Sequence, residues 1–204
     1  MKKQPNETVC SCKSECNLSR RNALKITTGV VLGLVAGLSP SIQASEEPAA
    51  NEERPCEGDY LVDANSEGKP VALKISDIAI GGQPIIAYPF NAKTGVLKDG
   101  SRLNKILLLR VDTQKIDQKF VKASADGVLA YSGVCTHKGC DITTYDSDND
   151  EIVCFCHFSK FQPTDGGEVI GGPAPRNLPI LPMKLDNQTL VVAGEFLSRP
   201  GATN

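Results

Sequence analysis

Beyond the N-terminal 44 residues, the apolar stretches are short, rich in β-branched side chains, and interrupted by glycine, proline, asparagine or aspartate. This pattern is typical of β-strands joined by turns. No stretch of this part of the chain shows sustained helical amphipathicity with caps. The pattern therefore predicts an all-β, antiparallel domain. The expected strands are residues 71–75, 85–90, 106–111, 128–131, 142–145, 151–155 and 190–193.

The N-terminal segment has a different pattern, in which a basic front precedes one apolar run. The run extends from Ile26 to Leu38, Pro40 follows it, and Ala44 offers a small-residue cleavage point. This order predicts a secretory signal in residues 1–44. The run of 13 residues is shorter than the roughly 17–25 residues that span a bilayer. An uncleaved anchor extended by flanking residues is the alternative.

Composition divides the rest of the chain into three parts. Residues 45–59 are polar and acidic, and we expect a linker there. Residues 60–204 have the length of one ordinary domain, and the chain as a whole is 40% hydrophobic, enough for a buried core. Within it, the window 134–178 holds four of the eight cysteines, both histidines and a Gly/Pro-rich exit. This window predicts a small loop-built subdomain that carries the chemistry.

The net charge of the chain depends on whether the predicted signal, residues 1–44, called here the leader, is present. Without residues 1–44, the chain has 16 Lys and Arg against 22 Asp and Glu, a net charge of −6. This balance argues against nucleic acid as a partner. We expect the acidic surface to serve solubility, or to steer a basic redox partner.

Two short boxes carry the candidate ligands. They read Cys-Thr-His-Lys-Gly-Cys at 135–140 and Cys-Phe-Cys-His-Phe-Ser at 154–159. Each box offers one thiol, one imidazole and a further cysteine, and the intervening residues are enough for a hairpin that brings the boxes together. Zinc held by two cysteines and two histidines is one alternative, although structural zinc sites usually pair like ligands. Two plain disulfides are another alternative.

The two boxes resemble those of the Rieske proteins, Cys-x-His-x-Gly-Cys and Cys-x-Cys-His-x-Ser. The resemblance implies the Rieske fold and one [2Fe–2S] cluster, with Cys135 and Cys154 on one iron and His137 and His157 on the other. It also implies a disulfide that joins the remaining two box cysteines, Cys140 and Cys156. The proline that usually follows the first cysteine of the second box is phenylalanine here, which changes a spacer and no ligand. Replacing two thiolates by neutral imidazoles places the potential at about −150 to +300 mV, against about −400 mV for all-cysteine plant-type clusters.

Four further residues take expected roles from the resemblance. The Ser159 hydroxyl would donate a hydrogen bond to a bridging sulfide and raise the potential. Phe161 stands where quinol-oxidising relatives usually have tyrosine, so a donor is missing and a middling potential is expected. Gly139 stands where the first box pattern has glycine, and Pro173 lies in the stretch 171–175, which resembles the proline loop that covers the cluster in cytochrome bc-type relatives.

The census of histidines excludes one class of enzyme. A Rieske oxygenase needs a second iron on a two-histidine, one-carboxylate site, and the cluster uses both histidines of this chain. We therefore expect an electron-transfer subunit that has no catalytic residues of its own. Three cysteines (Cys10, Cys12 and Cys16) would leave with the leader, and Cys56 is an odd thiol with no assigned role.

Export is predicted from a second resemblance, and the partners from the resemblance to the Rieske proteins. The segment Ser19–Lys25 resembles a twin-arginine export signal, which together with the disulfide predicts the periplasm; an inner-membrane anchor facing the periplasm is the alternative. The region around residues 156–179 resembles the small subunit of arsenite oxidase, whose large partner is a molybdopterin subunit. The iron–sulfur subunit of a quinol–cytochrome c reductase and a free-standing periplasmic carrier are the alternatives, and a soluble cytochrome-type acceptor is expected.

Overall fold

The structure is a computed structural model of the chain, and it describes residues 49–202. The predicted signal, its twin-arginine segment, the cleavage point and the three leader cysteines lie outside the described residues. Within the described range, no helix is long and apolar enough to cross a bilayer. The regular structure of this range consists of strands and short 3-10 helices.

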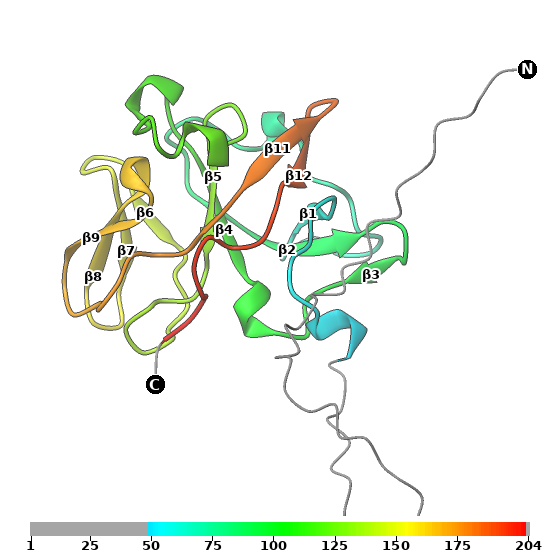
Figure 1. Cartoon of the computed structure of the whole chain (residues 1–204), viewed down its shortest axis with the longest axis horizontal. Coiled ribbons are helices and arrows are strands. Elements are labelled where there is room, and N and C mark those ends of the chain that lie inside the picture. Colours follow the sequence, from blue (N-terminus) through cyan, green and yellow to red (C-terminus); the bar gives the residue numbers. More distant parts are fainter. Residues whose placement is uncertain (1–48, 203–204) are drawn as a thin grey trace, which may run out of the picture. The chain divides into compact units, whose positions relative to one another are not determined.

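The larger sheet has eight strands, and all its strand pairs are antiparallel (Figure 1). Its order is β10-β5-β4-β2-β1-β12-β11, with β3 paired to β2. The strands are β1 (Tyr60–Asp63), β2 (Ile85–Asn91), β3 (Val96–Leu97), β4 (Ile106–Arg110), β5 (Val128–Ser132), β10 (Ile180–Leu181), β11 (Met183–Asp186) and β12 (Thr189–Val192).

The smaller sheet has four antiparallel strands in the order β6-β7-β8-β9. It lies inside the window expected as a loop-built subdomain, so that subdomain contains more regular structure than the sequence indicates. The strands are β6 (Thr144–Asp146), β7 (Glu151–Cys154), β8 (Ser159–Gln162) and β9 (Glu168–Gly171).

Short 3-10 helices form several of the connections between strands. In η3 and η4, the N-cap side chains of Ser101 and Asp112 accept hydrogen bonds from backbone N–H groups of the first turn. The six helices are η1 (Ala50–Glu52), η2 (Ile75–Asp77), η3 (Arg102–Asn104), η4 (Thr113–Lys115), η5 (Val121–Ala123) and η6 (Pro163–Asp165).

Strands β4 and β5 separate two apolar cores. Along β4, Leu107 and Leu109 belong to the core that includes the smaller sheet, whereas Ile106 and Leu108 belong to the other core. Successive side chains of a strand point to opposite faces, so a strand buried on both faces is apolar throughout. This explains the uninterrupted Ile-Leu-Leu-Leu run. The smaller sheet therefore packs on one face of the central strands β4 and β5.

Five of the seven expected strands are observed with shifts of two residues or fewer at their ends, at 85–90, 106–111, 128–131, 151–155 and 190–193. The expected strand 142–145 begins later, at Thr144. The expected strand 71–75 is wrong: the segment makes only isolated bridges, from Ala72 and Lys74. Its apolar alternation buries Leu73 and Ile75, but without consecutive pairing no ladder forms.

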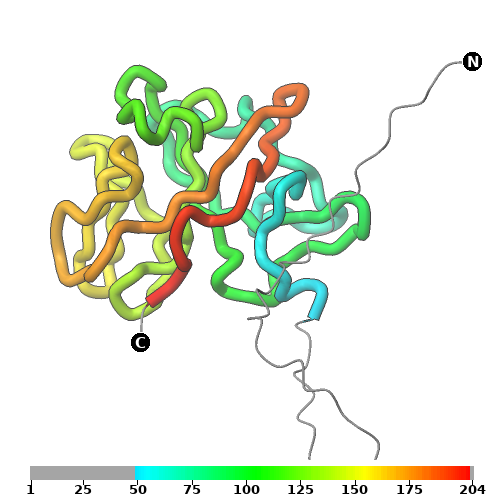
Figure 2. The backbone as a smooth tube through the Cα atoms, viewed as in Figure 1, coloured from blue at the N-terminus to red at the C-terminus, as the bar shows by residue number. Residues whose placement is uncertain are grey.

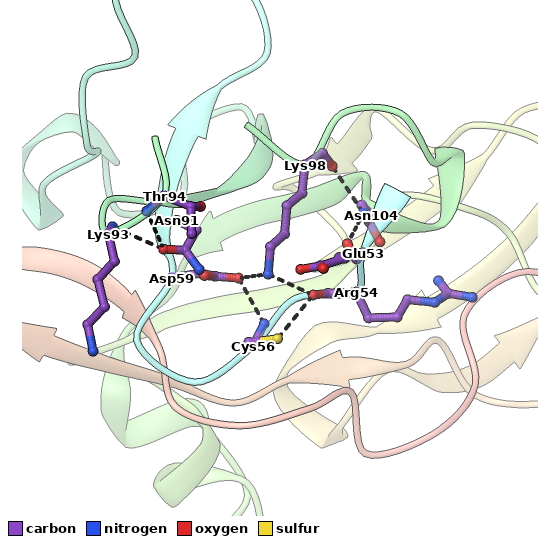
Figure 3. A network of polar contacts seen from close by, with 9 residues as sticks. All are labelled: Glu53, Arg54, Cys56, Asp59, Asn91, Lys93, Thr94, Lys98 and Asn104. Atoms are coloured by element: carbon purple, nitrogen blue, oxygen red, sulfur yellow. Dashed lines mark hydrogen bonds and ion pairs between the residues drawn. The ribbon is translucent and has the colours of Figure 1, made fainter. Parts of the chain in front are cut away.

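Residues 49–59, expected as part of a linker, make specific contacts with the domain. Asp59 is buried and its carboxylate lies 2.7 Å from the Nζ atom of Lys98, itself 1% exposed. Figure 3 shows that this ammonium also donates to the Arg54 carbonyl, and that the Cys56 N–H donates to the Asp59 carboxylate. The Asn104 side-chain amide donates to the carbonyl of Glu53. The segment is thus fixed by buried polar contacts before β1 begins.

Candidate metal centre

The first box lies in the loop after β5, residues 133–142, called here the first loop. Its ends are tied where the Ile142 N–H donates to the Gly133 carbonyl, and its middle is tied where the Cys135 N–H donates to the Cys140 carbonyl. Gly139 has φ +76°, a left-handed conformation that side chains with a Cβ disfavour. This conformation is the physical reason for a glycine in the box.

The second box forms the hairpin between β7 and β8, and residues 154–159 are called the second loop. Cys154 ends β7 and is paired with Ser159, the first residue of β8. Four residues connect the two, and among them Phe158 has a positive φ of 58°. This tight connection keeps Cys154 buried at the base while His157 is exposed at the tip.

A disulfide between Cys140 and Cys156 joins the two loops, as the resemblance implies. The sulfur atoms of Cys140, Cys154 and Cys156 lie within 4.8 Å of one another. This trio is not a metal site, because two of its sulfurs are already bonded together and only Cys154 retains a thiol. The disulfide instead holds the second loop against the first.

The four predicted ligands come together from the two loops. Cys135 and Cys154 are free, buried thiols that contact one another. The rings of His137 and His157 meet edge to face, with centroids 4.7 Å apart and planes at 88°. Each loop thus presents one buried sulfur and one imidazole nearer the surface. The assignment of these four residues as iron ligands stays a prediction, and their placement agrees with it.

Two orphaned polar atoms test whether the residues fit a metal cluster. The Nδ1 atom of His137 and the Oγ atom of Ser159 are buried, and neither has a hydrogen-bond partner among the described residues. A buried polar atom without a partner costs free energy unless something else satisfies it. A metal would satisfy an imidazole nitrogen, and a sulfide would satisfy a hydroxyl donor. The donor set therefore fits an iron–sulfur cluster with two thiolate and two imidazole ligands.

Protonation at the site also suits metal binding. Desolvation, and the nearby charges of His157 and Lys138, lower the pKa of His137 below its ordinary value. A neutral imidazole is the form that binds a metal. Burial raises the pKa of the Cys154 thiol, and backbone hydrogen bonds from Cys156 and His157 act in the opposite direction. Without metal this thiol is held protonated, so loading of the site must release a proton.

The expected supporting residues lie close to the loops. Phe161, 0% exposed, packs in the same apolar core as Cys135 and Cys154. The loop 171–175 lies against the second loop, and a Cβ at Gly172 (φ +76°) would be 2.3 Å from the Phe158 carbonyl oxygen. Ala174 of this loop is buried, and Pro173 is exposed. The expected proline loop therefore packs beside the second loop, with Pro173 on its outer side.

Two other contacts of the loops were not anticipated from the sequence. The Thr136 hydroxyl donates to the Arg176 carbonyl at 2.7 Å and ties the first loop to the residues after the proline loop. The Arg102 guanidinium donates to the Gly139 carbonyl and to the Asp141 carboxylate. Burial opposes ionisation of Asp141, but hydrogen bonds from Lys105 and Arg102 hold its pKa below the ordinary value. No local spacing signals these pairs, because their members are 36 to 40 residues apart.

Removal of the disulfide should destabilise the domain. Replacing Cys140 and Cys156 by serine opens a connection between residues 16 apart in the sequence, and a loop of this size corresponds to about 3 kcal/mol of unfolding free energy. Urea unfolding of the variant and the parent measures the difference. Cys56→Ser is the matched control, since a hydroxyl can still donate to the Arg54 carbonyl. Equal stabilities of parent and double variant would contradict the prediction.

Comparisons with known proteins identify one matching family and named relatives in that family. A family described as the Rieske [2Fe-2S] domain matches residues 94–182, which include both loops. A protein of Haloferax mediterranei, named as a respiratory nitrate reductase Rieske subunit, is 30% identical over 199 residues, 95% of this chain and 84% of that protein. A cytochrome bc1 complex Rieske iron–sulfur subunit of Streptomyces lividans is 32% identical over 68% of this chain and 82% of its own length. The ferredoxin of carbazole 1,9a-dioxygenase from Nocardioides aromaticivorans, a solved structure, is 16% identical with a TM-score of 0.42, over 70% of this chain and 100% of that chain.

Proposed function

Because this chain belongs to the Rieske [2Fe–2S] family, we propose that it is the periplasmic electron-transfer subunit of an arsenite-oxidase-like molybdenum enzyme. The coarser role, a Rieske iron–sulfur electron-transfer subunit, is common to its relatives. When bound, a cluster of this type accepts and releases single electrons. The remaining question is which protein exchanges those electrons with it.

The residues of the site define what the chain itself contributes. Cys135 and Cys154 would hold one iron from the buried side, and His137 and His157 would hold the other. His157 is exposed at the tip of the second loop, so its imidazole lies where a redox partner can approach. The disulfide and the proline loop fix the two loops relative to each other, which limits the structural change that accompanies electron transfer.

One observation carries the choice of complex. The match to the Haloferax nitrate reductase subunit extends over 95% of this chain, so the similarity is not confined to the two loops. That relative is named for a respiratory oxidoreductase other than a quinol–cytochrome c reductase. The absence of a hydroxyl at Phe161, and the resemblance of residues 156–179 to the arsenite oxidase subunit, support the same choice. The disulfide and the twin-arginine-like leader support an oxidising, periplasmic location.

The second candidate is the iron–sulfur subunit of a cytochrome bc complex, favoured by the Streptomyces relative and its name. Purification of the native complex in detergent separates the two. Molybdenum without b-type haem, in a complex whose Rieske chain begins near Ser45, supports the first proposal. A b-type haem protein that co-purifies with an uncleaved chain in the membrane fraction would overturn it in favour of the second.

Introduction of a hydroxyl at position 161 should raise the midpoint potential. Phe161 is buried in the same apolar core as both predicted cysteine ligands, and a hydrogen bond to a ligand sulfur stabilises the more negative, reduced state. One hydrogen bond of about 1 kcal/mol corresponds to a rise of about 40 mV for a single electron. A redox titration of Phe161→Tyr measures the shift. Phe158→Tyr, at an exposed position, is the control, and a Phe161→Tyr midpoint at or below that of the parent contradicts the prediction.

A further inference from the structure

Basic side chains gather around the two loops, although the domain as a whole is acidic. Four segments meet there: the first loop, the second loop extended to Lys160, residues 171–177, and the C-terminal tail 196–202. Together they hold four basic residues against one acidic residue, Asp141. The rest of the described chain holds twelve basic residues against nineteen acidic ones. The local charge is therefore opposite in sign to the charge of the remaining domain.

Direct contacts bring these segments together. The disulfide joins the two loops, and the Thr136–Arg176 hydrogen bond joins the first loop to the residues after the proline loop. The Arg176 guanidinium donates to the Gly201 carbonyl and so reaches the C-terminal tail. Figure 2 shows the red C-terminal tail running beside the yellow-green first loop. The basic residues thus belong to one continuous part of the surface.

Three arginines at or near this surface lack an acidic partner: Arg176 and Arg199 belong to the four segments, and Arg54 comes from the segment before β1 and lies near Arg199. Arg54, Arg176 and Arg199 form no ion pair with any carboxylate in residues 49–202. Burial, followed by the charge of Arg199, lowers the pKa of both Arg54 and Arg176. Arg199 is therefore close enough to repel both Arg54 and Arg176. Figure 3 shows the Arg54 side chain extending away from the buried Lys98–Asp59 pair, so this charge is not used inside the domain.

The arrangement of Arg176 points to a ligand. Its Nε atom is buried and has no hydrogen-bond partner among the described residues. Arg54 and Arg199 are exposed, and neither forms an ion pair with a carboxylate among residues 49–202. Neighbouring arginines that repel one another are stabilised when an anionic partner binds between them. Guanidinium groups bind carboxylates in bidentate geometry.

Exposed aromatic side chains lie on the second loop, which the disulfide holds against the first loop. Phe155 and Phe158 flank His157, and they are 62% and 64% exposed. Aromatic side chains and arginines are both enriched in the central part of protein interfaces. An anionic membrane is a poorer fit, because the remaining domain is acidic and would be repelled by it.

We propose that Arg54, Arg176 and Arg199 form the docking site for an acidic segment of the redox partner protein. The proposal rests on the function proposed above and adds the chemistry of the partner surface. The acidic remainder of the domain repels such a partner, so approach at the arginines, and hence beside the two loops, is favoured. The expected charge of the partner surface is therefore opposite to the one that the net charge suggests, since a net charge of −6 favours a basic partner.

Electron transfer to a small anion tests the local charge. In the reaction, the reduced protein loses one electron and ferricyanide becomes ferrocyanide, with no proton or bond change. If the surface beside the loops is positive, the stopped-flow rate of the full chain falls as ionic strength rises. The double variant Arg54→Glu, Arg199→Glu should reverse this dependence. Lys69→Glu, an exposed substitution elsewhere, should leave it unchanged. A rate of the unmodified chain that rises with ionic strength overturns the proposal.

A binding experiment tests the class of partner. Fluorescein-labelled hexaglutamate should bind the full chain. At about threefold to fivefold for each arginine, the double arginine variant should weaken this binding about tenfold to twenty-five-fold. If Lys69→Glu weakened peptide binding equally, the proposal would be overturned. It would also be overturned if the chain bound no peptide but sedimented with phosphatidylglycerol vesicles in an arginine-dependent way. These measurements use no native partner. Their failure is therefore distinguishable from failure of the proposed function, which the native purification tests.

Discussion

Replacement of His157 by alanine should abolish the rhombic, low-g electron paramagnetic resonance signal of the reduced protein. The signal depends on unequal ligation of the two irons, thiolates on one and imidazoles on the other. His157 is one of two histidines in the chain, so no other imidazole can replace it. The expected loss is complete rather than partial.

The control for this variant is Phe158→Ala, at the adjacent exposed position. It alters the same tip of the second loop but removes no predicted ligand, so its signal should match the parent. Far-ultraviolet circular dichroism of both variants establishes whether the sheets remain. A folded His157→Ala protein with an unchanged spectrum would remove His157 from the ligand set.

Asp59→Asn should lower the free energy of unfolding by about 3–5 kcal/mol, because it leaves a buried ammonium group without its counter-charge. The Lys98 ammonium is 2.7 Å from Asp59 and otherwise donates to the Arg54 carbonyl (Figure 3). Urea unfolding measures the loss. Asp99→Asn, at an exposed neighbouring position, should change stability by no more than about 0.5 kcal/mol.

A variant that lacks both charges distinguishes the effect of the unpaired charge from the effect of side-chain packing. The double variant Asp59→Asn, Lys98→Met should recover much of the lost stability, because no unpaired charge remains buried. A loss below about 1 kcal/mol for Asp59→Asn alone would show that the pair is not the element that fixes residues 49–59.

The same pair predicts a pH dependence. Burial opposes the charge of Lys98, but the hydrogen bond and charge of Asp59 raise its pKa above the ordinary value. A raised folded pKa contributes stability that is fully present below the unfolded value of about 10.4 and is lost as pH rises through the folded pKa. The parent should therefore lose stability in alkali more steeply than the Asp59→Asn, Lys98→Met variant.

Local patterns predicted the central strands of the fold because these strands have apolar residues at every position or at every second position. Strand β4 is buried on both faces and reads as a continuous apolar run. Strand β11 was missed although Met183 and Leu185 alternate with Lys184 and Asp186, so its signal was present in the sequence. Strands β3 and β10 have two residues each, too few for any period. Strand β8 is polar in composition, and its pairing with β7 and β9 on both sides defines it.

The candidate site was predictable to the extent that its chemistry is local in the sequence. The two boxes contain the thiols, the imidazoles and the cysteines that form the disulfide. The contacts that hold the loops are distant in sequence, as in Arg102 with Gly139 and Thr136 with Arg176. Net charge was also misleading near the site, because summation over the chain conceals a basic surface within an acidic domain.

The metal and sulfide content of the chain, purified without oxygen, tests the central claim most directly. The central claim is that two thiols and two imidazoles from neighbouring loops bind one [2Fe–2S] cluster of the Rieske type. Two iron atoms and two inorganic sulfides per chain are therefore predicted. Zinc in place of iron, or iron-free protein from a carefully anaerobic preparation, would contradict the account.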